Sequence, residues 1–138
     1  MKTTVLKGNK VDRNWHLIDL QGQTLGRICT QIATILMGKD KPTFSYHRDD
    51  GDYVVAINSD AIKVTGKKLK EKIYYHHTHW SGGLKELTLA EMLKKDSRNV
   101  IFHGVYGMLP KNKLRDIRMT RLKVFIDANH SYNDKIKK

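Results

Sequence analysis

The hydrophobic pattern in the first third of the chain alternates between the periods of strands and helices. An apolar stretch at residues 15–20 predicts a short strand, and a turn signal follows it. Residues 25–36 then place apolar side chains at i, i+3, i+7, i+10 and i+11, which is one face of an amphipathic helix. Thr24 suits the N-cap of this helix, and Gly38 suits its C-terminal end. Strand, turn and helix in this order predict the first half of a βαβ unit.

Further apolar segments extend the strand pattern along the chain. The unbroken apolar run at residues 53–57 predicts a central strand covered on both faces, as is typical of parallel sheets. Further strands are predicted at residues 62–64 and 122–126. Together these segments predict an α/β fold, and the length of 138 residues fits one domain. We expect an extended basic N-terminal arm over about residues 1–14 and a short polar tail over about residues 127–138.

Two helices are predicted between the third and the last of these strands. Thr88 and Glu91 have the spacing of a capping box, in which each side chain satisfies a backbone N–H group at the helix start. A second apolar repeat at residues 100–109 is predicted to be capped by Asp96 or Ser97. Its two glycines weaken this helix unless another element packs closely against its backbone.

Charge adds a functional constraint to this picture. The chain has 26 Lys and Arg against 14 Asp and Glu, a formal net charge of +12. A folded domain this basic usually binds a polyanion, although a cationic surface without a partner is the alternative. The cations gather at residues 67–72 and 111–123, and this clustering favours a polyanionic partner.

The remaining composition favours a reducing compartment and no membrane. Cys29 is the only cysteine, so no disulfide can form within the chain. Because Cys29 lies beside the apolar face of the predicted helix, we expect it to be a core residue rather than a nucleophile. No apolar run approaches the ~20 residues of a membrane span, and neither a signal-peptide nor a transit-peptide pattern is visible. We therefore expect a cytoplasmic protein.

Asp49, Asp50 and Asp52 precede the predicted central strand and suggest a metal site. A calcium loop would need oxygen ligands at alternate positions and a closing Glu, whereas apolar residues follow this run. We predict that the run is a solvated turn that leads into the strand.

Residues 72–85 are the most unusual stretch, because they combine aromatics, histidines and a glycine pair between lysines. A zinc site usually takes ligands from two separated Cys/His pairs, and no second pair accompanies His76, His77 and His79. Nothing marks Ser81 as a nucleophile. An enzyme that cleaves RNA with two of these histidines and a lysine is the sharpest enzymatic alternative.

RNA binding accounts for more of this stretch than either metal binding or catalysis does. Phosphates attract lysine and arginine, and unpaired bases stack on aromatic rings. The pair Gly82-Gly83 also lets backbone N–H groups approach a phosphate closely. One of the adjacent residues Tyr74 and Tyr75 is expected to pack on the protein instead, because neighbouring strand residues face opposite ways.

Several motifs in register resemble the family of bacterial-type large-subunit ribosomal protein thirteen. The resemblance covers about residues 12–126. The motifs are Thr24-Leu-Gly-Arg27, Gly51-Asp-Tyr-Val54, Val64-Thr-Gly-Lys67, Lys72-x-Tyr-Tyr-His-His-Thr-x-x-x-Gly-Gly-Leu-Lys85, Val105-x-Gly-Met-Leu-Pro110 and Arg121-Leu-Lys-Val-Phe125.

This resemblance implies a three-layer α/β/α fold around a small, mostly parallel four-stranded sheet. It implies a structural, non-enzymatic protein of the large ribosomal subunit that binds large-subunit rRNA early in assembly. It further implies neighbouring ribosomal proteins as partners, a place in cytoplasmic ribosomes, and no cofactor, metal or small-molecule substrate.

We expect two phosphate-binding groups of cations and an aromatic group between lysines. The first cationic group is Lys67, Lys68, Lys70, Lys72 and Lys85. The second is Lys111, Lys113, Arg115, Arg118 and Arg121. Tyr75, His76 and His77 are expected to stack or to donate hydrogen bonds to the RNA.

The chain departs from the family pattern at three places that bear on these expectations. After Met-Leu-Pro the family tends to read Leu-Gly-Arg, where this chain has Leu114-Arg115-Asp116. The family tends to have Thr-Gly after the paired histidines, where this chain has Thr78-His79, so a tight turn at residue 79 is not expected to follow from the resemblance. The tail also differs, with Asp127 in place of a glycine and His130-Ser131-Tyr132 in place of His-Pro-His.

Overall fold

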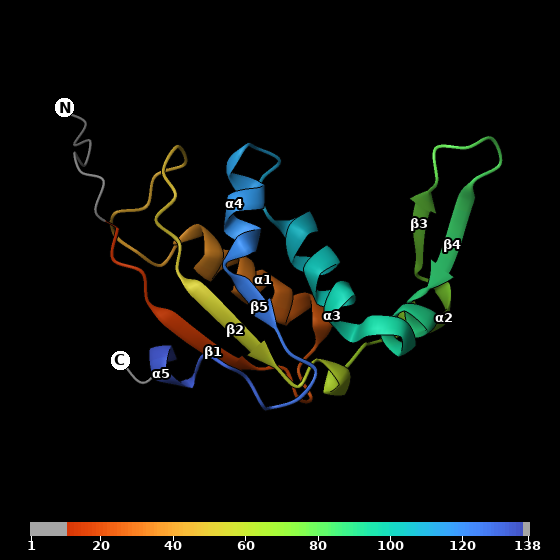
Figure 1. Ribbon diagram of the computed structural model, residues 1–138, viewed down its shortest axis with the longest axis horizontal. Coiled ribbons are helices and arrows are strands. Elements are labelled where there is room, and N and C mark those ends of the chain that lie inside the picture. Colours follow the sequence, from red (N-terminus) through yellow and green to blue (C-terminus); the bar gives the residue numbers. More distant parts are fainter. Residues whose placement is uncertain (1–10, 137–138) are drawn as a thin grey trace.

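The computed structural model describes residues 11–136 and has a parallel sheet at its centre. The predicted N-terminal arm therefore lies mostly outside the described residues. Strand β2 (Tyr53–Ile57) occupies the middle of the sheet, between β1 (Trp15–Asp19) and β5 (Leu122–Val124) (Figure 1). Both pairings are parallel. The central position explains why β2 is the most apolar strand.

Helices α1 (Leu25–Met37) and α3 (Leu89–Met108) share one hydrophobic core with the sheet. Helix α4 (Leu114–Thr120) leads into β5, and the short α5 (Asn133–Ile136) lies beside β1 (Figure 1). The predicted α/β class is confirmed. The described sheet has three strands rather than the expected four, since residues 62–64 contribute only one parallel bridge, between Thr24 and Lys63.

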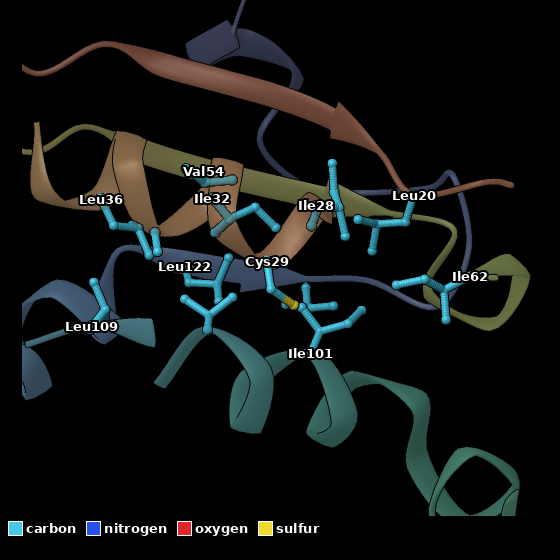
Figure 2. Close-up of a cluster of buried hydrophobic side chains, with 14 of the residues drawn as sticks. Leu20, Ile28, Cys29, Ile32, Leu36, Val54, Ile62, Ile101, Leu109 and Leu122 are labelled. Atoms are coloured by element: carbon cyan, nitrogen blue, oxygen red, sulfur yellow. The ribbon is translucent and has the colours of Figure 1, made fainter. Parts of the chain in front are cut away.

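Helix α1 buries the stripe that its spacing predicts. Ile28, Cys29, Ile32 and Leu36 point into the core, which they share with Ile101 of α3 and with Leu109, the residue that follows α3 (Figure 2). Each such Leu or Ile stabilises the fold by about 1.5–3 kcal/mol when fully buried. A Cβ on Gly104 would lie 2.7 Å from the Cys29 sulfur, so this glycine lets α1 and α3 pack closely. Gly104 thus provides the close approach that the sequence required.

Helix α3 consists of two helical segments joined at Asp96. Asp96 has φ −165° and ψ 104°, outside helical values, and its carboxylate accepts a hydrogen bond from the Arg98 N–H group at 3.0 Å. The predicted cap at this position is therefore Asp96. Thr88 and Glu91 form the predicted capping box at the start of α3.

A separate unit projects from the sheet and its helices. It comprises helix α2 (Lys68–Glu71) and the antiparallel strands β3 (Ile73–His77) and β4 (Leu84–Thr88). The 3₁₀ turn η1 (Ser59–Ala61) precedes this unit and stays with the core, where the hydroxyl groups of Ser59 and Ser97 lie 2.7 Å apart. We call residues 67–88 the arm; it stands away from the sheet, at the end of the molecule distant from α5 (Figure 1). Its base is fixed by the bond from the Leu89 N–H group to the Lys72 carbonyl, 2.9 Å.

The other face of the sheet is covered in part by the C-terminal segment. Trp15 of β1 stacks on Tyr53 at 4.3 Å and on Tyr132 at 5.2 Å between ring centroids. The ammonium group of Lys135 lies 5.0 Å from the Trp15 ring. The predicted polar tail is therefore anchored to the sheet by aromatic contacts within residues 127–136.

Candidate nucleic-acid interface

The arm presents its lysines to solvent. Lys67, Lys68, Lys70 and Lys72 are all exposed, on or next to the short helix α2. Within residues 11–136 none of these four ammonium groups forms an ion pair with a carboxylate. Lys72 lies 5.2 Å from the ring centroid of Tyr74 instead. The arm therefore carries uncompensated positive charge that phosphates could neutralise.

The strand pairing of the arm divides its aromatic residues between two faces. Because side chains alternate along a strand, Tyr75 and His77 lie on one face of β3, and Tyr74 and His76 on the other. Tyr75 is 64% exposed. Tyr74 is half-buried, with its ring centroid 5.6 Å from that of His103 in α3. The prediction that one of the two tyrosines packs on the protein is confirmed, and it is Tyr74.

A tight turn closes the arm in spite of the departure at residue 79. His79 adopts φ +65°, in the left-handed region that favours glycine. Its N–H group donates to Nδ1 of His77 at 2.9 Å, and the Thr78 N–H group donates to the Gly83 carbonyl at 3.0 Å. Since Nδ1 of His77 accepts this bond, its Nε2 carries the ring proton and remains available as an outward donor.

Lys85 completes the cations of the arm. It is exposed on β4 and lies directly opposite His76 in the pairing of the two strands. This places a cation and a histidine on the same face of the ribbon, the face opposite to Tyr75 and His77. Both faces of the arm therefore carry groups that can donate hydrogen bonds to RNA.

A second group of cations lies at the far end of α3 from the arm. Lys111 and Lys113 are exposed in the loop before α4. Arg115 is half-buried, with its guanidinium carbon 4.2 Å from the ring centroid of Tyr106. This stacking fixes the plane of the guanidinium group and still leaves part of it open to solvent.

The structure corrects the prediction for Arg118 and Arg121. Both are buried, 2% and 4% exposed, and both face the carboxylate of Asp49. Arg121 Nη2 lies 2.6 Å from Asp49 Oδ1, while Arg118 Nε lies 3.5 Å from the same oxygen, an ion-pair distance that is too long for a good hydrogen bond. These guanidinium groups are parts of the core and leave the set of candidate phosphate contacts.

The prediction of a solvated turn at residues 49–52 is also wrong, because this turn packs against the buried arginines and does not face water. Arg13 reaches the turn from the N-terminal side, with its Nη1 2.7 Å from the Gly51 carbonyl. A Cβ on Gly51 would come within 1.8 Å of the Leu36 carbonyl oxygen, so only glycine fits between the turn and α1. We call Arg13, Asp49, Arg118 and Arg121 the Asp49 cluster.

Neighbouring cations and hydrogen bonds lower the pKa of two carboxyl groups in this turn, Asp49 and Asp52. Burial raises the pKa of Asp49, but the hydrogen bonds and charge of Arg121, with the charges of Arg13 and Arg118, outweigh it, so the pKa lies below its ordinary value. Burial likewise raises the pKa of Asp52, but hydrogen bonds from Lys41 and His16 outweigh it, so this pKa also lies below its ordinary value.

The two other chemistries considered from the sequence find little support in the described part of the chain. No group of three or more His, Cys, Asp or Glu side chains in residues 11–136 could hold a metal ion. Burial raises the pKa of the Cys29 thiol to about 11, against the opposing charge of Lys72, so this thiol is not an activated nucleophile. Among residues 11–136 no helix is long and apolar enough to cross a membrane.

Two features of the structure were not predicted from the sequence. The pairing of Asp49 with Arg118 and Arg121 joins residues up to 72 positions apart, which no local pattern reveals. Trp80, at the tip of the arm, is 79% exposed and was not among the predicted RNA contacts. Its position beside the glycine pair of the turn is the signal that could have identified it.

The family model and the relatives that match this chain all belong to the same protein family. Residues 13–131 match the family model described as Ribosomal protein L13. Large ribosomal subunit protein uL13 of Clostridioides difficile is 52% identical over 132 residues, which cover 96% of this chain and 92% of that protein. The protein of the same name from Wigglesworthia glossinidia brevipalpis is 48% identical, with 96% and 93% covered. That from Thermotoga petrophila is 46% identical, with 95% and 88% covered.

Proposed function

The chain belongs to the ribosomal protein L13 family, and from this premise we propose that it binds large-subunit rRNA through the arm and through the cations before α4. The family is one of structural, non-enzymatic constituents of the large ribosomal subunit, with a role in translation. The relatives compared are bacterial, and bacterial ribosomes lie in the cytoplasm, in agreement with the expected compartment.

The observation that carries the proposal is the set of exposed arm lysines without carboxylate partners. Each phosphate that such a lysine neutralises releases condensed counterions, and this release supplies sequence-independent affinity. Tyr75, His76 and His77 extend from the same arm and add stacking surfaces and hydrogen-bond donors. Lys85, Lys111, Lys113 and Arg115 add further phosphate contacts.

Arg118 and Arg121 have an indirect role in this proposal. By pairing with Asp49 they fix α4 against the turn at residues 49–52, and the bond from Arg121 Nη2 to the Leu36 carbonyl, 3.1 Å, ties the end of α4 to α1. Helix α4 follows directly on the loop that carries Lys111 and Lys113. The position of the second cationic group therefore depends on the Asp49 cluster, although the cluster itself does not reach the RNA.

The salt dependence of binding to large-subunit rRNA tests the proposal. If the four exposed arm lysines each neutralise one phosphate, a plot of log K against log salt is expected to have a slope of about −3 or steeper. Each neutralised phosphate contributes roughly 0.7–0.9 to the magnitude of that slope. Affinity that hardly changes between low and moderate salt would contradict the phosphate-binding surface.

A matched pair of variants separates the arm from charge in general. Lys67→Gln with Lys70→Gln removes two charges from the arm, and Lys94→Gln with Lys95→Gln removes two exposed charges beside Glu91 and Asp96 in α3. We expect the arm pair to reduce the magnitude of the salt slope by roughly 1.5, and the α3 pair to reduce it by less than half of that. Equal losses would mean that the arm is not the binding surface.

We further propose that the protein acts early in assembly of the large subunit and contacts neighbouring ribosomal proteins there. Membership of the family supports this part of the proposal. Reconstitution of the subunit without this protein is expected to stop at an early particle, and a normal yield of mature subunits would contradict an assembly role. Crosslinking in the complete particle identifies the protein neighbours.

A further inference from the structure

The two tryptophans of the chain have opposite environments. Trp15 is stacked between Tyr53 and Tyr132 and lies under the ammonium group of Lys135. Trp80 is 79% exposed at the tip of the arm, and its ring meets no aromatic ring or cation within the described chain. Trp80 shares the arm with the exposed apolar side chains of Tyr75 and Leu84, and such a group, unlike a single exposed residue, points to a binding contact.

Backbone hydrogen bonds hold the turn that carries Trp80. The Gly83 N–H group donates to the Trp80 carbonyl at 2.9 Å, and the Thr78 N–H group donates to the Gly83 carbonyl at 3.0 Å. The bond from the His79 N–H group to His77 Nδ1 fixes the other side of the turn. A ring presented on an ordered turn loses little conformational entropy when it binds, and this favours its use as a contact.

The surroundings of Trp80 select the kind of partner. No Asp or Glu occurs between Lys72 and Lys85, so the tip does not repel a polyanion. His77 is exposed next to the turn, and because its Nδ1 accepts a bond, its Nε2–H group can donate one. A flat apolar ring beside hydrogen-bond donors, on an arm with uncompensated lysines, matches a ligand that has both a flat π-face and a negative charge, which is a nucleotide.

We propose that Trp80 stacks on an unpaired nucleobase of the bound RNA and so makes the arm selective for a bulge, loop or junction. This inference rests on the proposed binding of rRNA and deepens it. Bases within an A-form helix are covered by their neighbours and cannot offer a free face, whereas a looped or bulged base can. The lysines hold the RNA backbone, and Trp80 determines which part of the RNA meets the tip of the arm.

Fluorescence provides the first test, with the full chain and large-subunit rRNA as the probe. In a Trp15→Phe variant Trp80 is the only tryptophan, because the chain has two. We expect saturating rRNA to quench the fluorescence of Trp80 strongly, since a stacked base replaces water at the indole ring. Unchanged fluorescence while the same sample binds rRNA would overturn the stacking contact.

Affinity provides the second test. Trp80→Ala is expected to weaken binding about 5- to 150-fold, the range for loss of one stacked base, and to leave the salt slope unchanged, because no charge is removed. Trp80→Tyr should retain most of the affinity. The control is Tyr46→Ala, since Tyr46 is 77% exposed in the loop between α1 and β2, outside the arm, and its loss is expected to change binding less than twofold. Equal losses at Trp80 and Tyr46 would overturn the inference.

Crosslinking determines whether the contacted base is unpaired. After ultraviolet irradiation of the complex, the tryptic peptide of residues 73–85 should carry a nucleotide that reagents for unpaired bases modify in the free rRNA. Attachment only to paired nucleotides would overturn the inference. If the wild-type protein fails to bind rRNA at all, the proposed function fails. If it binds and Trp80→Ala binds as well, only the role of Trp80 fails.

Discussion

The Asp49 cluster and the arm use similar runs of positive charge in opposite ways. Near Asp49, arginines that lie far apart in the chain converge on one carboxylate and become part of the core. In the arm, lysines of one short segment remain exposed and without carboxylate partners in the described chain. The comparison shows that the density of charge along a sequence does not by itself distinguish a binding surface from a structural contact.

The residue types fit these two roles. A guanidinium group is planar, offers five donors and can bind a carboxylate with two parallel bonds, as Arg121 does with Asp49. The ammonium group of lysine is strongly hydrated and is held at the end of a flexible chain. Such a group can follow irregular phosphates at a surface and is expensive to bury.

The largest effect is expected when the carboxylate of the cluster is removed. Asp49→Ala leaves Arg118 and Arg121 buried without their shared counter-charge, which should lower the free energy of unfolding by about 3–5 kcal/mol. Urea denaturation measures the loss. Asp116→Ala, at an exposed carboxylate of α4, is the control and should change stability by less than about 0.5 kcal/mol. Similar small losses at both positions would mean that the cluster is not structural.

Removal of the arm charges should act on binding rather than on folding. A variant with all four exposed arm lysines replaced by Gln should have a salt slope for rRNA that is smaller in magnitude by about 3. The four are Lys67, Lys68, Lys70 and Lys72. The free energy of unfolding should change by less than about 1 kcal/mol, because these side chains are exposed. A variant that loses stability but keeps its salt slope would reverse the assignment of the two regions.

Acid should weaken the cluster before it affects the charge of the arm. The folded pKa of Asp49 lies below its unfolded value, so the resulting stability is fully present above the unfolded pKa of about 3.9 and is lost as pH falls through the folded pKa. Urea midpoints between pH 6 and pH 2 should therefore fall less in Asp49→Ala than in the wild type. Parallel curves for the two proteins would show that Asp49 is not the group responsible.

The smallest effect is expected at the turn of the arm. A non-glycine residue in the left-handed region costs roughly 1–2 kcal/mol, which the greater freedom of unfolded glycine partly offsets. His79→Gly should therefore raise the free energy of unfolding by up to about 1 kcal/mol. His76→Gly, in regular strand β3, is the control and should lower it. Thermal denaturation of the two variants tests whether His79 is strained.

The sequence was most informative where structure depends on near neighbours. The stripe of α1, the capping box at Thr88 and the cap at Asp96 all follow from spacings of a few residues, and each is present. Burial of Arg118 and Arg121 could not be predicted in this way, because it depends on Asp49 in a distant segment. The turn at His79 shows a related limit, since a bond to His77 and the closure of the strands hold a backbone conformation that residue type disfavours.

The chain order of the Asp49 cluster has a consequence for the synthesis of the protein. Asp49 and β2 are made early, but the arginines and the strand that complete their surroundings come from residues 118–124. The sheet and the cluster therefore close only after most of the chain has left the ribosome that makes it. The pairing of β3 with β4 and the bond from Leu89 to Lys72 join residues that are close in the chain, so they can form earlier in synthesis, and the packing of Tyr74 on His103 of α3 follows. The part of the proposed RNA surface that lies on the arm is thus synthesised before the last strand of the domain that supports it.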